Sequence, residues 1–204
     1  MIKYLLKFVA EKNHAEVLLN GTLFMRPASY YWHLEQGQGD INETAIIPFA
    51  RIYKHSRLPI YCMYSVMDTD IVDNTITVSG RCIKDFKCED GYVVIIDYPQ
   101  FAKRLKTLKS WGFEVQGKLV YYHVLTNADT TMLLNDNTPR NVFIKHPYFA
   151  YQKEYRITVC HEIYKLGQLK LDHKEYEFST NIRDIAYVQK VPRPKADGKY
   201  ILSL

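Results

Sequence analysis

The sequence contains little glycine and proline, no long apolar run and none of several common enzyme motifs. Its 204 residues include only 9 glycines and 8 prolines, too few for a collagen-like or low-complexity protein. The longest uninterrupted apolar runs, such as Tyr92–Ile96, fall far short of the ~20 residues that a membrane-spanning helix needs. GxSxG, GxGxxG, Walker and HExxH motifs are all missing. The sequence therefore gives no support to a hydrolase, a Rossmann domain or a P-loop enzyme.

Cysteine is also scarce, and its spacing is uninformative for metal binding. No two of the four cysteines form a CxxC pair. Zinc ribbons and knuckles need such pairs, so we expect reduced and mostly buried thiols rather than a zinc site. The opening MIKYLLKFVAEK is not a signal peptide, because Lys7 interrupts its apolar stretch. We therefore expect a cytoplasmic protein without a membrane anchor.

Charge and tyrosine content indicate which partners the chain suits. Lys and Arg number 27 against 22 Asp and Glu, which gives a formal net charge of +5. This mild excess permits an anionic partner such as a nucleic acid or a dinucleotide, but it does not require one. The 17 tyrosines favour β-sheet and also suit a half-wet ligand cleft. They equally suit a homodimer interface, and the sequence does not separate these two alternatives.

The pattern of apolar residues predicts a single α+β domain over residues 1–204, with a largely antiparallel sheet. Two short helices are expected near the N-terminus: one capped by Asn13, and one over Pro27–Gln36. A longer middle helix should follow the cap Asp97, and residues 192–204 should form an irregular tail. Strands are expected at Ile2–Val9, Thr22–Met25, Leu58–Val66, Thr75–Ile83, Tyr92–Ile96, Lys118–Leu125, 154–159, Tyr176–Thr180 and Asp184–Val191.

The segment FAYQKEYRITV, residues 149–159, carries the first candidate site. Period-two alternation places Glu154, Arg156 and Thr158 on one polar face of a strand, with Glu154 at its start. A carboxylate beside a guanidinium can bind sugar hydroxyls and stabilise a developing positive charge. The alternative is a surface Glu–Arg pair on a half-exposed strand, which would contribute little.

The segment MRPASYYWHLEQ, residues 25–36, carries the second candidate site. Three adjacent aromatic residues and His33 follow Arg26. Such a cluster can stack a flat ring such as nicotinamide or a base while the arginine binds a phosphate. Alternatively, Tyr30, Tyr31 and Trp32 only anchor a short helix to the sheet.

Two further patterns suggest other chemistry. The helix face with Lys103, Arg104, Lys106 and Lys109 could follow a phosphate backbone or simply face solvent. The acidic segment DTDIVDN contributes Asp68, Asp70 and Asp73, which would need Asp40 and Glu43 to build a nuclease-like metal site. This segment lacks the glycine and distal glutamate of a calcium loop, and nothing in the sequence brings the two groups together. We therefore expect no metal.

Several motifs, in their order along the chain, resemble those of a family of uncharacterised bacterial and phage proteins. The motifs are the strand YLLKFV, the helix A-x-x-L-L-x-G, LFMRPASYYW, GQGD, the strand YCMYS, Y-x-K-E-Y-R-I and I-x-D-I-A-Y-V. The best-matching segment is Tyr151–Arg156, because commoner relatives carry W-x-Y-E-x-E-W-R there. The same layout is more faintly similar to the ADP-ribosyltransferase-like fold.

This second resemblance implies an enzyme that cleaves the nicotinamide–ribose bond of NAD and transfers ADP-ribose to nucleic acid or protein. Glu154 would be the catalytic carboxylate. The resemblance and the two candidate segments together give the cofactor-binding residues Arg26, Tyr30, Tyr31, Lys7 and Arg156. In this assignment Tyr30 or Tyr31 stacks on nicotinamide and Arg26 binds the pyrophosphate. Lys7 lies near the first-strand residue that contacts NAD in that fold.

Two other functions stay open at this point. One is a non-enzymatic phage or mobile-element protein that binds a host factor, and the other is a metal-dependent nuclease. The transferase predicts that Glu154, Arg26 and an aromatic residue line one pocket. The binding protein predicts a flat exposed aromatic patch, with Glu154 paired to Arg156 or to a neighbouring lysine. The nuclease predicts convergence of the acidic residues named above.

Overall fold

The computed structural model describes residues 1–33, 45–47, 50–51, 57–110, 112–124, 126, 129, 139–160 and 174–204. The GQGD segment with Asp40 and Glu43, and the C-terminal end of the helix expected over Pro27–Gln36, lie outside these residues. None of the described helices is long and apolar enough to cross a membrane.

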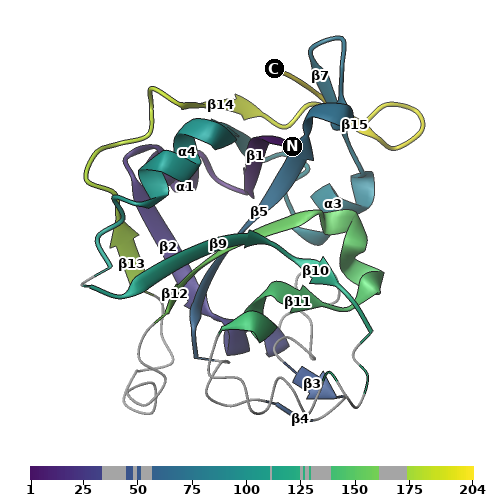
Figure 1. Cartoon of the computed structure of the whole chain (residues 1–204). Coiled ribbons are helices and arrows are strands. Elements are labelled where there is room, and N and C mark those ends of the chain that lie inside the picture. The colour runs from purple at the N-terminus through teal and green to yellow at the C-terminus, as the bar shows by residue number, and fades with distance from the viewer. Residues whose placement is uncertain are drawn as a thin grey trace.

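A mixed architecture with a mostly antiparallel sheet is present, as the sequence predicts (Figure 1). The main sheet has the strand order β13 (Lys174–Glu177), β2 (Thr22–Pro27), β5 (Pro59–Met67), β1 (Ile2–Val9), β8 (Tyr92–Asp97) and β14 (Ala186–Lys190). On a further branch, β12 (Glu154–Cys160) pairs with both β5 and β9 (Glu114–Leu119). Every pairing within this sheet is antiparallel.

The long strand β5 forks the sheet. Ile60 pairs with β2 on one edge and with β12 on the other, whereas Tyr64 pairs with β1 and with β12. Since each strand has two edges, β1 and β2 share the edge opposite β12. They pair with different ends of β5 and separate between residues 60 and 64. Figure 1 shows β5 running through the molecule, with β1 near its upper end and β2 to its left.

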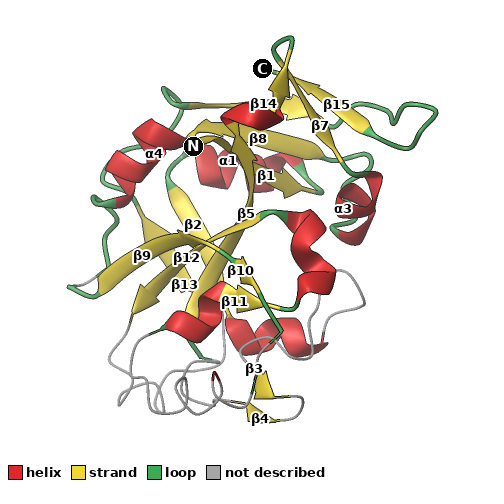
Figure 2. Cartoon of the chain, turned by 45° about the vertical axis from the view of Figure 1, so that its right-hand side comes forward, coloured by secondary structure: helices red, strands yellow, loops and turns green. Residues whose placement is uncertain are grey.

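Both faces of the sheet are covered, which makes a layered core (Figure 2). The helices α1 (Lys12–Leu19) and α4 (Tyr98–Leu105) pack on one face. The small sheet of β6 (Ile71–Val72), β7 (Thr75–Val78) and β15 (Tyr200–Ser203) packs with α3 (Gly80–Asp85) on the other. Successive residues of β8 enter the two cores in turn. This confirms the prediction that the apolar run Tyr92–Ile96 is covered on both faces.

Two of the expected helices form, with different caps. In α4 the carboxylate of Asp97 accepts a hydrogen bond from the backbone N–H of Gln100 at 2.9 Å, as its N-cap position predicts. In α1 the predicted cap is wrong: Glu11 is the N-cap, and Asn13 lies inside the helix. No side chain caps α1, so burial of Ala15, Leu18 and Leu19 supplies its stability.

The short elements differ more from expectation. After β2 the chain forms a 3₁₀ turn, η1 (Ala28–His33), in place of the start of an α-helix, because Pro27 still pairs with Pro59 in the sheet. The strand expected over Thr75–Ile83 ends at Val78, and α3 follows it.

The remaining small elements are short strands and 3₁₀ turns. The predicted Lys118–Leu125 strand is split into the end of β9 and β10 (Tyr121–Tyr122). β11 (Ile144–Lys145) pairs with β10 and lies between the 3₁₀ turns η3 (Arg140–Phe143) and η4 (Pro147–Gln152). The short strands β3 (Ala45–Ile47) and β4 (Ala50–Arg51) form a separate pair. The predicted irregular tail is wrong in part, because β15 pairs with β7 and closes the second core.

Gly21 ends α1, as predicted, with a φ of 95°. A Cβ there would lie 2.8 Å from the carbonyl oxygen of Thr180. We expect Gly21→Ala to lower the free energy of unfolding by about 1–3 kcal/mol, measured by urea denaturation. Gly112→Ala is the matched control, because Gly112 has a φ of 86° with no described atom within 4 Å of the added Cβ. Equal losses in both variants would contradict a steric contribution at Gly21.

Candidate functional site

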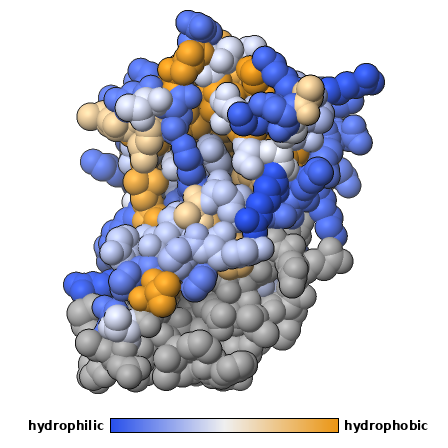
Figure 3. Space-filling model, turned by 90° about the vertical axis from the view of Figure 1, so that its right-hand side faces the viewer, coloured by the Kyte–Doolittle hydropathy of each residue, from blue (hydrophilic) through white to orange (hydrophobic). Residues whose placement is uncertain are grey.

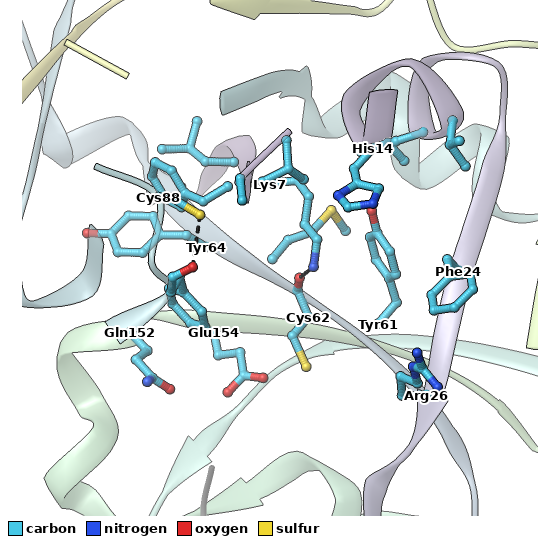
Figure 4. A pocket seen from close by; sticks show the side chains of 18 of the residues that line it. Lys7, His14, Phe24, Arg26, Tyr61, Cys62, Tyr64, Cys88, Gln152 and Glu154 are labelled. Atoms are coloured by element: carbon cyan, nitrogen blue, oxygen red, sulfur yellow. Dashed lines mark hydrogen bonds between the residues drawn. The ribbon is translucent and has the colours of Figure 1, made fainter. Parts of the chain in front are cut away.

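A pocket of about 610 Å³, here called the fork pocket, lies where β1 and β2 separate from each other along β5. Residues from α1, η1 and the start of β12 complete its wall (Figure 4). All the predicted site residues except Arg156 line this pocket: Lys7, Arg26, Tyr30, Tyr31 and Glu154. They come from four segments of the chain, and the separation of β1 from β2 makes room for their side chains.

Glu154 lies at the start of β12 and is only 6% exposed. Its Oε1 accepts a hydrogen bond from Nε of Arg156 at 2.8 Å, and its Oε2 accepts one from Nη2 at 3.1 Å. Nζ of Lys145 donates to the same Oε2 at 3.3 Å. Arg156, 1% exposed, lies behind the carboxylate and also donates to the carbonyl of Val142 at 2.6 Å. The carboxylate is therefore held in one orientation.

The charge state of Glu154 follows from two opposing effects. Burial raises the pKa of its carboxyl group. The charges of Arg156 and Lys145 and the hydrogen bond from Arg156 lower this pKa by more than burial raises it. The net pKa lies below its usual value, so the group is ionised at neutral pH. The expected polar face of β12 exists, but it is buried rather than half-exposed, since Thr158 is fully buried as well.

Arg26 and a group of aromatic rings form the opposite side of the pocket (Figure 4). The guanidinium carbon of Arg26 lies 4.6 Å from the ring centroid of Tyr30 and 4.9 Å from that of Phe24. The rings of Tyr30 and Tyr31 meet edge to face, with centroids 5.5 Å apart. Tyr30 is 41% exposed, so its ring is accessible to a ligand.

Lys7 and two neighbouring residues of β5 occupy the middle of the pocket. Nζ of Lys7 donates to the carbonyl of Cys62 at 2.9 Å and lies 4.4 Å from the centroid of the Tyr61 ring. Burial lowers the pKa of Lys7, although Cys62 and Glu154 oppose this effect. Burial and the charge of Glu154 raise the pKa of the Cys62 thiol, which favours its neutral form.

Three further residues of the site, Lys145, Gln152 and Tyr61, are not predicted from the sequence. Lys145 is buried on the two-residue strand β11, and its Nζ also donates to Oε1 of Gln152 at 2.9 Å. No periodic pattern surrounds so short a strand, so no sequence signal marks Lys145. Tyr61 stands in the strand YCMYS, whose apolar composition indicates core rather than a pocket wall.

None of the described residues of the other candidate sites lines this pocket. Arg104 of α4 pairs with Asp184; the helix ends at Leu105, so Lys106 and Lys109 of the expected basic helix face lie beyond it, and Lys109 pairs with Glu177. Asp68 accepts a hydrogen bond from the N-terminal ammonium at 2.9 Å, and Asp70 accepts one from Lys153 at 2.7 Å. Within the ranges that the structure describes, no group of three or more His, Cys, Asp or Glu residues is placed to hold a metal ion.

The surface away from the pocket carries scattered exposed rings. Tyr121, Tyr148 and Tyr187 are 63%, 59% and 44% exposed. Figure 3 shows hydrophobic residues appearing in separate places among hydrophilic ones on the described part of one face. Tyr148 and Tyr121 come from different elements, η4 and β10, and neither residue lines the pocket.

Comparisons with known proteins gave no match: no family model fits the sequence, and neither the curated proteins nor the solved structures contain a similar chain.

Proposed function

We propose that this protein binds NAD in the fork pocket, breaks its nicotinamide–ribose bond and transfers ADP-ribose to a nucleic acid or protein. The observation that carries this proposal is the shared pocket of Glu154, Arg26, Tyr30 and Tyr31. An ionised, oriented carboxylate faces a guanidinium set among aromatic rings. This combination suits a ligand that has a ribose, a diphosphate and a flat ring.

The chemistry assigned to the pocket is dissociative. The bond between ribose C1′ and the nicotinamide nitrogen breaks, and its electron pair leaves with nicotinamide. The sugar then has oxocarbenium character, which the negative charge of Glu154 stabilises. Arg156 and Lys145 hold the carboxylate in place before the reaction, so no reorganisation is needed at the transition state. An acceptor oxygen or nitrogen finally bonds to C1′ and loses its proton.

The remaining residues bind the substrate. Arg26 presents planar N–H donors that match a phosphate, and its stacking on Tyr30 and Phe24 restricts its position. Tyr30 and Tyr31 offer faces and edges for the nicotinamide ring. Lys7 donates from the floor of the pocket, between these two sides (Figure 4).

The first test is the release of nicotinamide from NAD by the purified chain, together with calorimetric titration of NAD. We expect saturable binding and slow release of nicotinamide, since water can replace the acceptor. Absence of binding at millimolar NAD, with the protein folded, would reject the proposal.

Tyr30→Ala tests the aromatic side of the pocket. Loss of one stacking ring should weaken NAD binding by about 1–2 kcal/mol, roughly tenfold in Kd. The matched control is Tyr187→Ala, because Tyr187 is 44% exposed against 41% for Tyr30 and does not line the pocket. The control should bind NAD as the unmodified protein does. If both variants bind equally well, Tyr30 does not contact the ligand.

A second candidate function is non-enzymatic binding of a host factor. The observation that favours it is the pairing of Glu154 with Arg156 and Lys145, which by itself fulfils a structural role. This candidate predicts that the pocket releases no nicotinamide from NAD and that Glu154 matters for stability alone.

A further inference from the structure

Lys7 occupies a special position in the fork of the sheet. The described pairing between β1 and β5 ends at Leu6 and Tyr64, one residue before Lys7. Beyond this point the two strands separate, and the Lys7 side chain enters the pocket and donates to the carbonyl of Cys62. The lysine thus contacts β5 where a paired strand would otherwise lie.

The surroundings of the Lys7 amine are less polar than those of most lysines. In the described part of the chain its hydrogen bond goes to an uncharged carbonyl, and it forms no ion pair. The ring of Tyr61 covers one side of Nζ at 4.4 Å. Figure 4 shows Nζ above the Cys62 carbonyl and near the Tyr61 ring, with the carboxylate of Glu154 farther away.

Desolvation in the pocket favours the neutral amine, whereas the Cys62 carbonyl and the Tyr61 ring favour the ammonium. Burial lowers the pKa of Lys7, and the opposing influences come from Cys62, Glu154 and Cys88. The other ionisable side chains on the pocket wall belong to His14, Arg26, Tyr30, Tyr31, Tyr61, Tyr64 and Glu175. A desolvated lysine in an apolar pocket is the usual form of an amine that attacks carbonyl groups.

We propose that Lys7 is a nucleophilic amine that forms an imine with a phosphorylated aldehyde bound in the pocket. The amine nitrogen bonds to the carbonyl carbon, and both of its protons leave with the carbonyl oxygen as water. This gives one C=N bond and one water molecule, with no oxidant or reductant. The inference does not depend on NAD as a substrate.

The phosphate in this ligand class follows from Arg26. Figure 4 shows Arg26 and Phe24 on the side of the pocket away from Glu154, with Lys7 between the two sides. A phosphate directed to Arg26 stays clear of the Glu154 carboxylate, which would repel it. The rings of Tyr61 and Phe24 leave an apolar surface for the body of the ligand between the aldehyde and the phosphate.

The test uses pyridoxal 5′-phosphate as the probe and sodium borohydride to reduce the imine, followed by peptide mass spectrometry of the full chain. At pH 7 we expect Lys7 to be labelled at least about tenfold faster than Lys3, which is an exposed lysine on the same strand. Because the neutral amine is the form that attacks a carbonyl carbon, a larger neutral fraction at Lys7 makes imine formation faster there. Labelling of Lys7 no faster than Lys3 would overturn the proposal, and this comparison requires no variant.

Two variants test the phosphate and the site. Arg26→Gln should raise the concentration of pyridoxal 5′-phosphate for half-maximal labelling about tenfold and leave labelling by pyridoxal, which lacks the phosphate, unchanged. An equal effect on both probes would contradict a phosphate contact. Lys7→Arg should abolish the adduct on the peptide that contains residue 7, with circular dichroism melts confirming the fold. A persistent adduct on that peptide would place the reaction at another lysine.

Discussion

Replacement of Arg156 with methionine is expected to lower the free energy of unfolding by about 3–5 kcal/mol. Methionine keeps much of the side-chain volume but removes all three donors. The carboxylate of Glu154 would then stay buried with Lys145 at 3.3 Å as its remaining cation. The carbonyl of Val142 would also lose its hydrogen bond from the guanidinium. Urea denaturation followed by circular dichroism measures the effect.

Arg104 provides a matched control at the surface. Its guanidinium donates to both oxygens of Asp184, at 2.7 and 2.8 Å, and to the carbonyl of Asn181. Like Arg156, Arg104 thus donates two hydrogen bonds to one carboxylate and one to a backbone carbonyl, but the side chain of Asp184 is 61% exposed. Arg104→Met should cost no more than about 1 kcal/mol because water replaces the lost partners. Similar losses in the two variants would show that burial of the Glu154 pair does not decide its contribution.

The effect of Arg156→Met should depend on pH. In the unmodified protein the pKa of Glu154 is lowered from 4.5, so its ionisation stabilises the fold above that value. This stabilisation is lost as the pH falls toward the lower folded-state value. In the variant, loss of the Arg156 charge raises the pKa, so protonation relieves the buried charge sooner. The stability difference between the two proteins should therefore narrow as the pH falls through the higher folded-state pKa of Glu154 in the variant, in denaturation curves taken from pH 7 to pH 3. A constant difference over this range would contradict the assigned charge state.

Glu154→Gln is expected to reduce the rate of nicotinamide release from NAD by about 10²–10³-fold. The amide keeps the shape of the side chain but removes the charge that stabilises the oxocarbenium-like sugar. NAD affinity should change much less, because the proposed binding contacts lie with Arg26 and the tyrosines. The measurement is single-turnover release of nicotinamide at saturating NAD, with calorimetry for binding.

A second carboxylate in the pocket gives the control for this variant. Glu175 lines the pocket from β13 but is exposed, and no described ion pair orients it. Glu175→Gln should leave the rate within a few-fold of the unmodified protein. Because Glu154→Gln also disturbs a buried ion pair, both rates are taken at a temperature where thermal melts show each variant folded. If the two variants lose the same activity, general pocket charge rather than Glu154 governs the reaction.

Local sequence patterns were sufficient to predict several elements of the fold. The apolar run Tyr92–Ile96 predicts a strand covered on both faces, and Asp97 predicts the start of α4. Gly21 predicts the end of α1. Alternation over 154–159 predicts which side chains of β12 enter the core, and Tyr155, Ile157 and Val159 do so. These features depend on neighbours within a few residues, so the sequence alone carries them.

Other local predictions hold only in part, because tertiary pairing outweighs local propensity there. The segment after Arg26 is expected to form a helix, but Pro27 still pairs with Pro59 in the sheet. The last residues of the chain contain few strand signals, yet Tyr200–Ser203 finds an open edge on β7. In both places the partner comes from a distant part of the chain.

By itself the sequence determined that Glu154 and Arg156 share one face of a strand and that Arg26 precedes a group of aromatic residues. Only the tertiary structure decided that these groups line or support one pocket, because that depends on β1 and β2 pairing with different ends of β5. It also decided that the Glu154–Arg156 pair is buried, with Lys145 as a third member. Strand alternation separates two faces, but whether a face is buried depends on what the rest of the chain packs against it.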